Sequence, residues 1–216
     1  MNSLMPYHMI HCLHSLYHSI RYSVTSLCGN LSITADNENE TNLPLTFKMN
    51  ARLNPMKLKI FGFLLEGVDV SWDNLVHLDL SWTTFDGVLQ VIRDAPLLEI
   101  CSLSFILPPI DDFRIPEIII RHPYLRTLQL LFMEQTGVFH KLINSLELPS
   151  LESWSVQLIE LEESMVLDIM TSFLKRSDCK LKYLLKMEQD QAPTVEDFER
   201  FLQHQGKPPF MIITKY

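Results

Sequence analysis

The sequence has 216 residues, of which 47% are hydrophobic and 20% are charged, a composition typical of a folded globular protein. Its formal net charge of −8 argues against nucleic acid as a partner, and 6 Gly against 12 Pro argue against Gly-rich phosphate loops. Residues 1–20 lack the basic start of a signal peptide, and no later run reaches about 18 uninterrupted apolar residues. We therefore expect an intracellular protein, cytoplasmic or nuclear, that does not bind membranes.

The first segment, residues 1–27, is predicted to be a helical cap. Apolar residues recur in it at the spacing of a helix: Met9, Leu13, Leu16 and Ile20. His14 and His18 share one helix face, but no Asp or Glu occurs in the first 35 residues, and Cys12 falls on a different face. We therefore expect these His side chains to face solvent and not to bind metal.

A leucine-rich motif recurs over residues 28–187. Its clearest copy is the LxxLxL pattern at 75–80, with Leu75, Leu78 and Leu80. Further copies, of decreasing clarity, start at 98, 125, 151, 181, 55 and 28. Taken in chain order, the starts are separated by 27, 20, 23, 27, 26 and 30 residues. Leucine-rich repeats have periods of roughly 20–29 residues, so this spacing predicts such repeats.

The segments between these motifs predict helices that return antiparallel to the strands. Apolar residues at helical spacing favour helices over 85–92, 138–143 and 165–174, and a short one over 116–121. After the last repeat, Thr194 can N-cap a helix that runs to Leu202, and 208–213 is expected to be extended. Residues 188–216 are therefore predicted to form a C-terminal cap.

Units of strand, turn and helix must stack, because one unit cannot bury its apolar face alone. We therefore predict an α/β fold, a single leucine-rich-repeat solenoid over 1–216. Its parallel strands would form the concave face and its helices the convex face.

Side chains alternate along a strand, so the residues between the Leu positions face outward. Solenoids bind partners on their concave surface. The predicted partner-binding residues are His77, Asp79, Ser102, Gln129, Ser153 and Ser155. The alternative interpretation is that these are solvated strand residues without a partner.

The sequence contains no recognised catalytic or cofactor motif, such as G-x-S-x-G, H-E-x-x-H or G-x-G-x-x-G. Asp111 and Asp112 are adjacent but have no His or Lys near them in sequence, so we expect a solvated loop. The Cys residues, at 12, 28, 101 and 179, form no CxxC pair. We therefore expect a non-enzymatic chain with no cofactor and no metal.

Three segments carry a family resemblance: 71–103 (SWDNLVHLDLSWTTFDGVLQVIRDAPLLEICSL), 122–130 (HPYLRTLQL) and 146–156 (LELPSLESWSV). They resemble the leucine-rich-repeat region of fungal F-box-like proteins. The resemblance implies an adaptor, in which an N-terminal F-box docks on a cullin–RING ubiquitin ligase and the repeats recruit a substrate protein.

This sequence departs from that family in two respects. No F-box is found before the repeats, and the usual Asn of the strand-to-helix turn is replaced. The replacing residues are Thr83, Ile106, Met133 and Ile159. The leading hypothesis is a protein-binding repeat module that resembles the substrate-recruiting part, with cullin–RING components as partners if an F-box lies upstream. The alternative is a truncated repeat remnant with no independent binding role.

Overall fold

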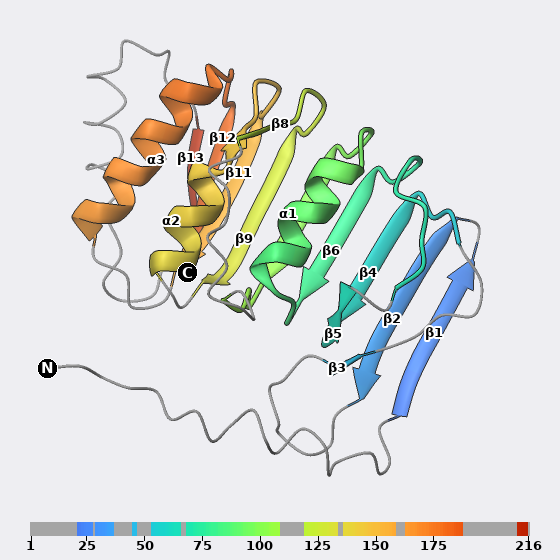
Figure 1. Ribbon diagram of the computed structural model, residues 1–216. Coiled ribbons are helices and arrows are strands. Elements are labelled where there is room, and N and C mark those ends of the chain that lie inside the picture. The colour runs from blue at the N-terminus through green and yellow to red at the C-terminus, as the bar shows by residue number, and fades with distance from the viewer. Residues whose placement is uncertain are drawn as a thin grey trace, which may run out of the picture.

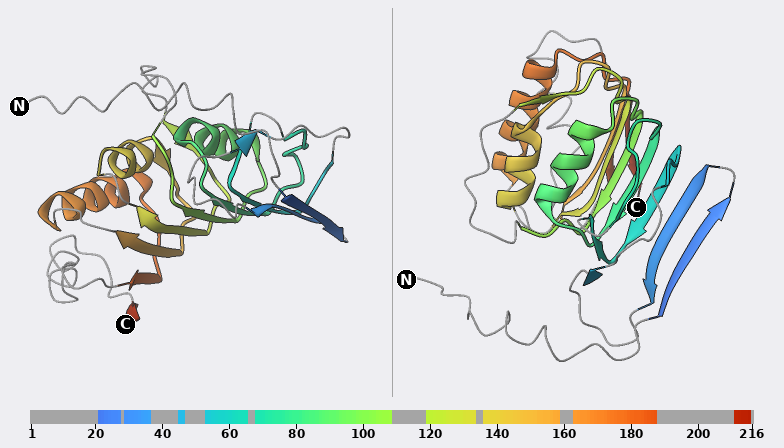
Figure 2. Two further views of the ribbon diagram at one scale, coloured as in Figure 1. Left: turned by 90° about the horizontal axis from the view of Figure 1, so that it is seen from below. Right: turned by 45° about the vertical axis from the view of Figure 1, so that its right-hand side comes forward.

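The structure is a computed structural model that describes residues 21–27, 29–36, 45–46, 53–65, 68–108, 119–133, 136–158, 163–187 and 211–215. Within them, a nine-stranded sheet carries three helices on one of its faces (Figures 1 and 2). In spatial order its strands are β1 (Arg21–Leu27), β2 (Asn30–Asp36), β4 (Lys57–Phe61), β6 (His77–Ser81), β7 (Ile100–Ser104), β9 (Thr127–Met133), β11 (Ser153–Leu158), β12 (Tyr183–Met187) and β13 (Met211–Lys215).

The sheet is parallel except at one edge. β1 and β2 form an antiparallel hairpin there, and every described pairing from β2 to β13 is parallel. Parallel neighbours need a crossover, and three crossovers contain the helices α1 (Phe85–Asp94), α2 (Thr136–Asn144) and α3 (Glu163–Ser177). The predicted α/β class with a parallel sheet is therefore confirmed.

Two short parallel pairs flank this sheet. β3 (Leu45–Thr46) pairs with β5 (Phe63–Leu64), and β8 (Ile120–Arg121) pairs with β10 (Leu146–Glu147).

The core consists of the leucine-rich positions, which the parallel register aligns in rows. One row crosses seven strands and is at most 3% exposed: Leu31, Leu58, Leu78, Cys101, Leu128, Trp154 and Leu184. A second row is at most 5% exposed: Ile33, Ile60, Leu80, Leu103, Leu130 and Val156. Because side chains alternate along each strand, equivalent positions of aligned strands share a face. The predicted core role of these positions, including Cys101 and Trp154, is confirmed.

A recurrent backbone contact joins each strand to the next. One carbonyl just before a strand accepts two N–H groups from the start of the following strand. The accepting residues are Gly29, Met56, Val76, Glu99, Arg126 and Glu152, and the last accepts from Lys182 and Tyr183. From Gly29 through to Lys182, these positions are separated by 27, 20, 23, 27, 26 and 30 residues. These are the separations of the predicted motif starts, so the sequence period is also the period of this contact.

The strand ends share a second recurrent geometry. Gly62, Trp82 and Phe105 follow β4, β6 and β7, and their φ angles of 79°, 57° and 51° lie in the left-handed region. The N–H of each donates to a backbone carbonyl of the next strand: that of Ser81 in β6, Ser104 in β7 and Leu131 in β9. Glycine adopts this conformation at little cost, whereas Trp and Phe are strained there. The Trp82 and Phe105 rings stack with centroids 4.5 Å apart, a contact that offsets part of the strain.

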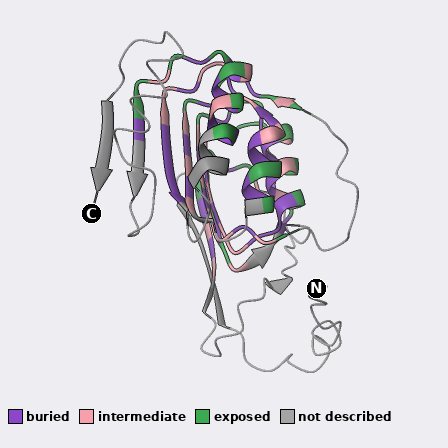
Figure 3. Cartoon of the chain, turned by 90° about the vertical axis from the view of Figure 1, so that its left-hand side faces the viewer, coloured by how far each residue is buried: buried purple, intermediate pink, exposed green. Residues whose placement is uncertain are grey.

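The helices are amphipathic and bury one side against the sheet. In α1 the buried residues are Phe85, Val88, Val91 and Ile92, at the spacing of one helical face. Figure 3 shows buried residues along the strands and the inner sides of the helices, with exposed residues on the outer sides. Asp86 and Arg93 lie in the first and last turns of α1, where they complement the helix dipole. The predicted helices over 85–92 and 138–143 are confirmed, and 165–174 lies within α3.

Buried polar side chains connect neighbouring units at the helix ends. His122 is 3% exposed, and its Nδ1 accepts the N–H of Leu125 at 3.1 Å. Its Nε2 therefore carries the proton and donates to the carbonyl of Ala95, the C-cap of α1, at 2.9 Å. This side chain satisfies a carbonyl at the end of one helix and an amide before the next strand.

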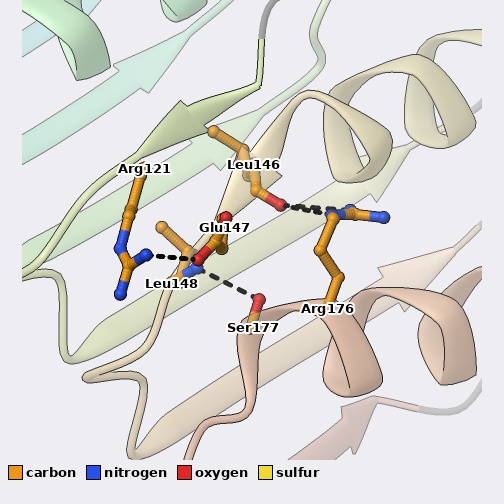
Figure 4. Close-up of polar contacts among 6 residues, drawn as sticks. All are labelled: Arg121, Leu146, Glu147, Leu148, Arg176 and Ser177. Atoms are coloured by element: carbon orange, nitrogen blue, oxygen red, sulfur yellow. Dashed lines mark hydrogen bonds and ion pairs between the residues drawn. The ribbon is translucent and has the colours of Figure 1, made fainter.

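Figure 4 shows a corresponding contact two units further along the chain. Arg176 of α3 donates to the carbonyl of Ile143 in the last turn of α2, at 2.7 Å, and twice to that of Leu146. The hydroxyl of Ser177 accepts the N–H of Leu148 at 3.0 Å. A cation at a helix C-terminus also opposes the negative end of the dipole. The end of α3 is thereby bonded to the end of α2.

Two predicted elements differ in the structure. Residues 21–27, placed in the helical cap, form strand β1, because their N–H and C=O groups pair along the whole length of β2. Residues 120–121, placed at the end of the short helix, form β8. Residue 119 of that predicted helix is described and is not helical, whereas residues 1–20, 116–118 and the helix from Thr194 lie outside the described residues. The predicted extended segment 208–213 overlaps β13 over 211–213.

Candidate interaction surface on the open sheet face

The side of the sheet opposite the helices, here called the open face, is formed by alternate residues of the strands. No described helix lies on this side (Figure 2). The register aligns these residues in rows that cross the strands. The first row is Asn30, Lys57, His77, Ile100, Thr127, Ser153 and Tyr183. The second row is Ser32, Lys59, Asp79, Ser102, Gln129 and Ser155.

All six predicted partner-binding residues belong to these two rows. His77 and Ser153 are in the first row. The other four are consecutive members of the second: Asp79, Ser102, Gln129 and Ser155. Adjacent strands are about 4.8 Å apart, so these four side chains form one continuous polar line across β6, β7, β9 and β11.

The six predicted residues differ in exposure. Ser155 is 5% exposed, the least of the six. Gln157, two residues further along β11, is 9% exposed, and its Oε1 has no hydrogen-bond partner among the described residues. The remaining five predicted residues are half-buried. A strand pattern assigns a residue to a face, but the surroundings of that face determine its exposure.

Two of the candidate contacts are already made within the chain. The hydroxyl of Ser102 donates to Oε1 of Gln129 at 2.9 Å. Lys59 Nζ lies 3.1 Å from Asp79 Oδ2, with its side chain 57% exposed. Lys59 was not among the predicted residues, although its position between Leu58 and Ile60 marks it as outward-facing.

The open face is hollowed at the β2, β4 and β6 end. A shallow depression of about 310 Å³ is lined there by Asn30, Leu31, Ser32, Lys57, Leu58, Lys59, His77 and Asp79. Two predicted residues, His77 and Asp79, therefore line the same hollow as two lysines.

Large apolar side chains are exposed at two positions of the same face. Phe61 at the end of β4 is 40% exposed, and Tyr183 at the start of β12 is 47% exposed. Phe61 is in register with Ser81 and Ser104, in a third row beside the first two. The open face thus combines polar rows with isolated aromatic groups, as protein-binding surfaces do.

The described residues also bear on metal binding and on the reactivity of a buried cysteine. Among them, no group of three or more His, Cys, Asp or Glu side chains could hold a metal ion. Burial raises the pKa of the Cys101 thiol far above its usual range, with Asp79 adding to the effect, so the thiol stays protonated. The N-terminal His residues and the pair Asp111 and Asp112 lie outside the described part of the chain.

None of the helices described is both long enough and apolar enough to cross a membrane. No protein-family model matches the sequence, and searches of curated proteins and of solved structures return no significant match.

Proposed function

We propose that this chain is a non-enzymatic protein-interaction module built as a leucine-rich-repeat solenoid. The open face would be its concave side and the helices its convex side. The recurrent carbonyl contact supports this architecture, because its separations of 20 to 30 residues are close to the repeat lengths of such proteins. The left-handed residues after β4, β6 and β7 support it in the same way.

The observation that carries the binding role is the continuous polar line Asp79, Ser102 and Gln129 on the open face. These side chains are half-buried and shared among three strands, so a partner would contact a rigid surface rather than loops. Rigid polar groups need no reordering when a partner binds, which favours affinity.

By the sequence resemblance, we further propose that the partner is a protein recruited as in F-box-like adaptors. Coupling to a cullin–RING ubiquitin ligase would require an F-box upstream of the repeats. The resemblance suggests the class of partner, and the surface suggests where it binds.

An affinity purification with matched variants tests this proposal. Gln129→Arg places a long cation in the middle of the open face, whereas Gln90→Arg places the same group at an exposed position of α1. We expect Gln129→Arg to abolish recovery of the proteins that copurify with the unchanged chain, and Gln90→Arg to retain it. Equal recovery with both variants, each shown to be folded by circular dichroism, would contradict a binding role of the open face.

Copurification of cullin–RING components with a chain extended upstream, but not with the 216-residue chain, would support the ligase coupling. Absence of these components from both samples would exclude it and leave a free repeat module.

A further inference from the structure

Among the open-face side chains whose exposure the structure describes, positive charges outnumber negative ones, whereas the whole chain is acidic. The chain has 26 acidic and 18 basic residues. Among the open-face side chains whose exposure the structure describes, the charged ones are Lys57, Lys59 and Asp79. Two of these three are positive, and all three line the depression of about 310 Å³. The described side chains of the open face therefore carry their positive charge at one place.

The register sets the arrangement of hydrogen-bond donors in this depression. Lys57 lies between Asn30 and His77 in the first row, and Lys59 lies between Ser32 and Asp79 in the second. Adjacent members of a row are about 4.8 Å apart. Three nitrogen-bearing side chains of the first row thus stand side by side around one hollow.

These side-chain donors differ in whether they already bind another described side chain. Lys59 is paired with Asp79 at 3.1 Å. The side chains of Lys57 and His77 have no hydrogen-bond or ion-pair partner among the residues that the structure describes. The free cation of Lys57 and the imidazole beside it leave room for an acceptor group from another molecule.

We infer that the segment of the partner that occupies this depression is an acidic stretch of polypeptide, rich in Asp and Glu. This inference rests on the proposed function and specifies the class of its partner. Carboxylates of the segment accept hydrogen bonds from Lys57, with Asn30 and His77 beside it, and the hydroxyl and amide groups of Ser102 and Gln129 continue the contact along the second row. Opposite charge steers the encounter and selects against basic segments.

Asp79 modulates this surface. Its carboxylate neutralises Lys59 and repels an incoming carboxylate. Asp79→Asn removes both effects while keeping the shape of the side chain. Lys57→Gln removes the free cation. The two substitutions should therefore change the affinity for an acidic segment in opposite directions.

The experiment is a fluorescence-anisotropy titration of the full chain with a labelled peptide. The peptide has about ten residues that alternate Glu and Ser, and the salt concentration is about 0.05 M, where charge screening is weak. A peptide with Lys in place of Glu serves as the comparison. We expect Lys57→Gln to weaken binding of the Glu peptide about threefold to fivefold, and Asp79→Asn to tighten it by a similar factor. Lys182→Gln is the control, because Lys182 is an exposed lysine like Lys57 but does not line the depression.

Several outcomes would overturn the inference: equal affinity for the Glu and Lys peptides, the same direction of change in both variants, or an equal effect of Lys182→Gln. Binding of a single-stranded oligonucleotide as tightly as the Glu peptide, with the same dependence on Lys57, would assign the surface to nucleic acid and overturn it too. If the Glu peptide does not bind while Gln129→Arg still abolishes partner recovery, this inference fails and the proposed function stands. If the peptide binds as expected while Gln129→Arg retains every partner, the proposed function fails by itself.

Discussion

Replacement of His122 by Ala should destabilise the fold strongly, although this residue is not on the binding face. Its side chain is 3% exposed and makes two hydrogen bonds, one to the Ala95 carbonyl and one from the Leu125 amide. Truncation leaves both backbone groups without a partner in a site from which solvent is largely excluded. A buried group that loses its partner costs about 1–3 kcal/mol, so we expect the free energy of unfolding to fall by about 2–5 kcal/mol.

Two further variants separate the two bonds. The amide of His122→Asn can place an oxygen near the position of Nδ1 and keep the Leu125 bond, whereas His122→Gln can place a nitrogen near Nε2 and keep the Ala95 bond. Each should recover about half of the loss. Urea denaturation followed by far-ultraviolet circular dichroism measures these differences.

The control is His140→Ala, which removes an exposed imidazole that is hydrogen-bonded only to Asn144 of the same helix. We expect a change within about 0.5 kcal/mol for this variant. A loss for His122→Ala no greater than that for His140→Ala would refute the reasoning, because it would mean that the two buried bonds contribute nothing net.

Three further predictions follow from the polar and buried groups. Arg176→Met removes three hydrogen bonds to carbonyls near the end of α2, so urea denaturation should show a loss of about 1–3 kcal/mol, with no such loss for the exposed neighbour in Lys175→Met. Cys101 should resist iodoacetamide in the native chain and react after denaturation, as read by mass spectrometry of its peptide, because burial raises its pKa; rapid native labelling would contradict this. The hydrogen bond from Lys182 lowers the pKa of Glu152, so the stabilisation from this pair is present above the ordinary pKa of Glu and is lost as the pH falls through the lowered value. The difference in the free energy of unfolding between the unchanged chain and Lys182→Gln should therefore be larger at neutral pH than in acid. A difference that persists in acid would count against the pair.

The repeat period was predictable because short stretches of the sequence are enough to identify each strand and its buried side. The alternation of Leu78 and Leu80 with polar neighbours identifies a strand and its buried side without knowledge of any other part of the chain. The same holds for the apolar face of α1. Positions that depart from Leu, such as Cys101 and Trp154, were predictable because the phase of the repeat continued through them.

The edge of the sheet was not predictable in this way. Residues 21–27 have no leucine-rich motif, and their strand exists through pairing with β2, which is a contact between segments rather than a property of either one. The same reason applies to β8, which is only two residues long and pairs with β10 across about 26 residues of sequence.

The positions of the candidate residues on the sheet were predictable, but their burial and their side-chain partners were not. The sequence by itself determined which residues face away from the core, because the side-chain period of a strand is two. Only the tertiary structure decided that Ser155 is buried, that Lys59 pairs with Asp79 and that the Lys57 side chain has no described partner. Burial and pairing depend on side chains one repeat away, at separations of 20 to 30 residues that no local pattern encodes.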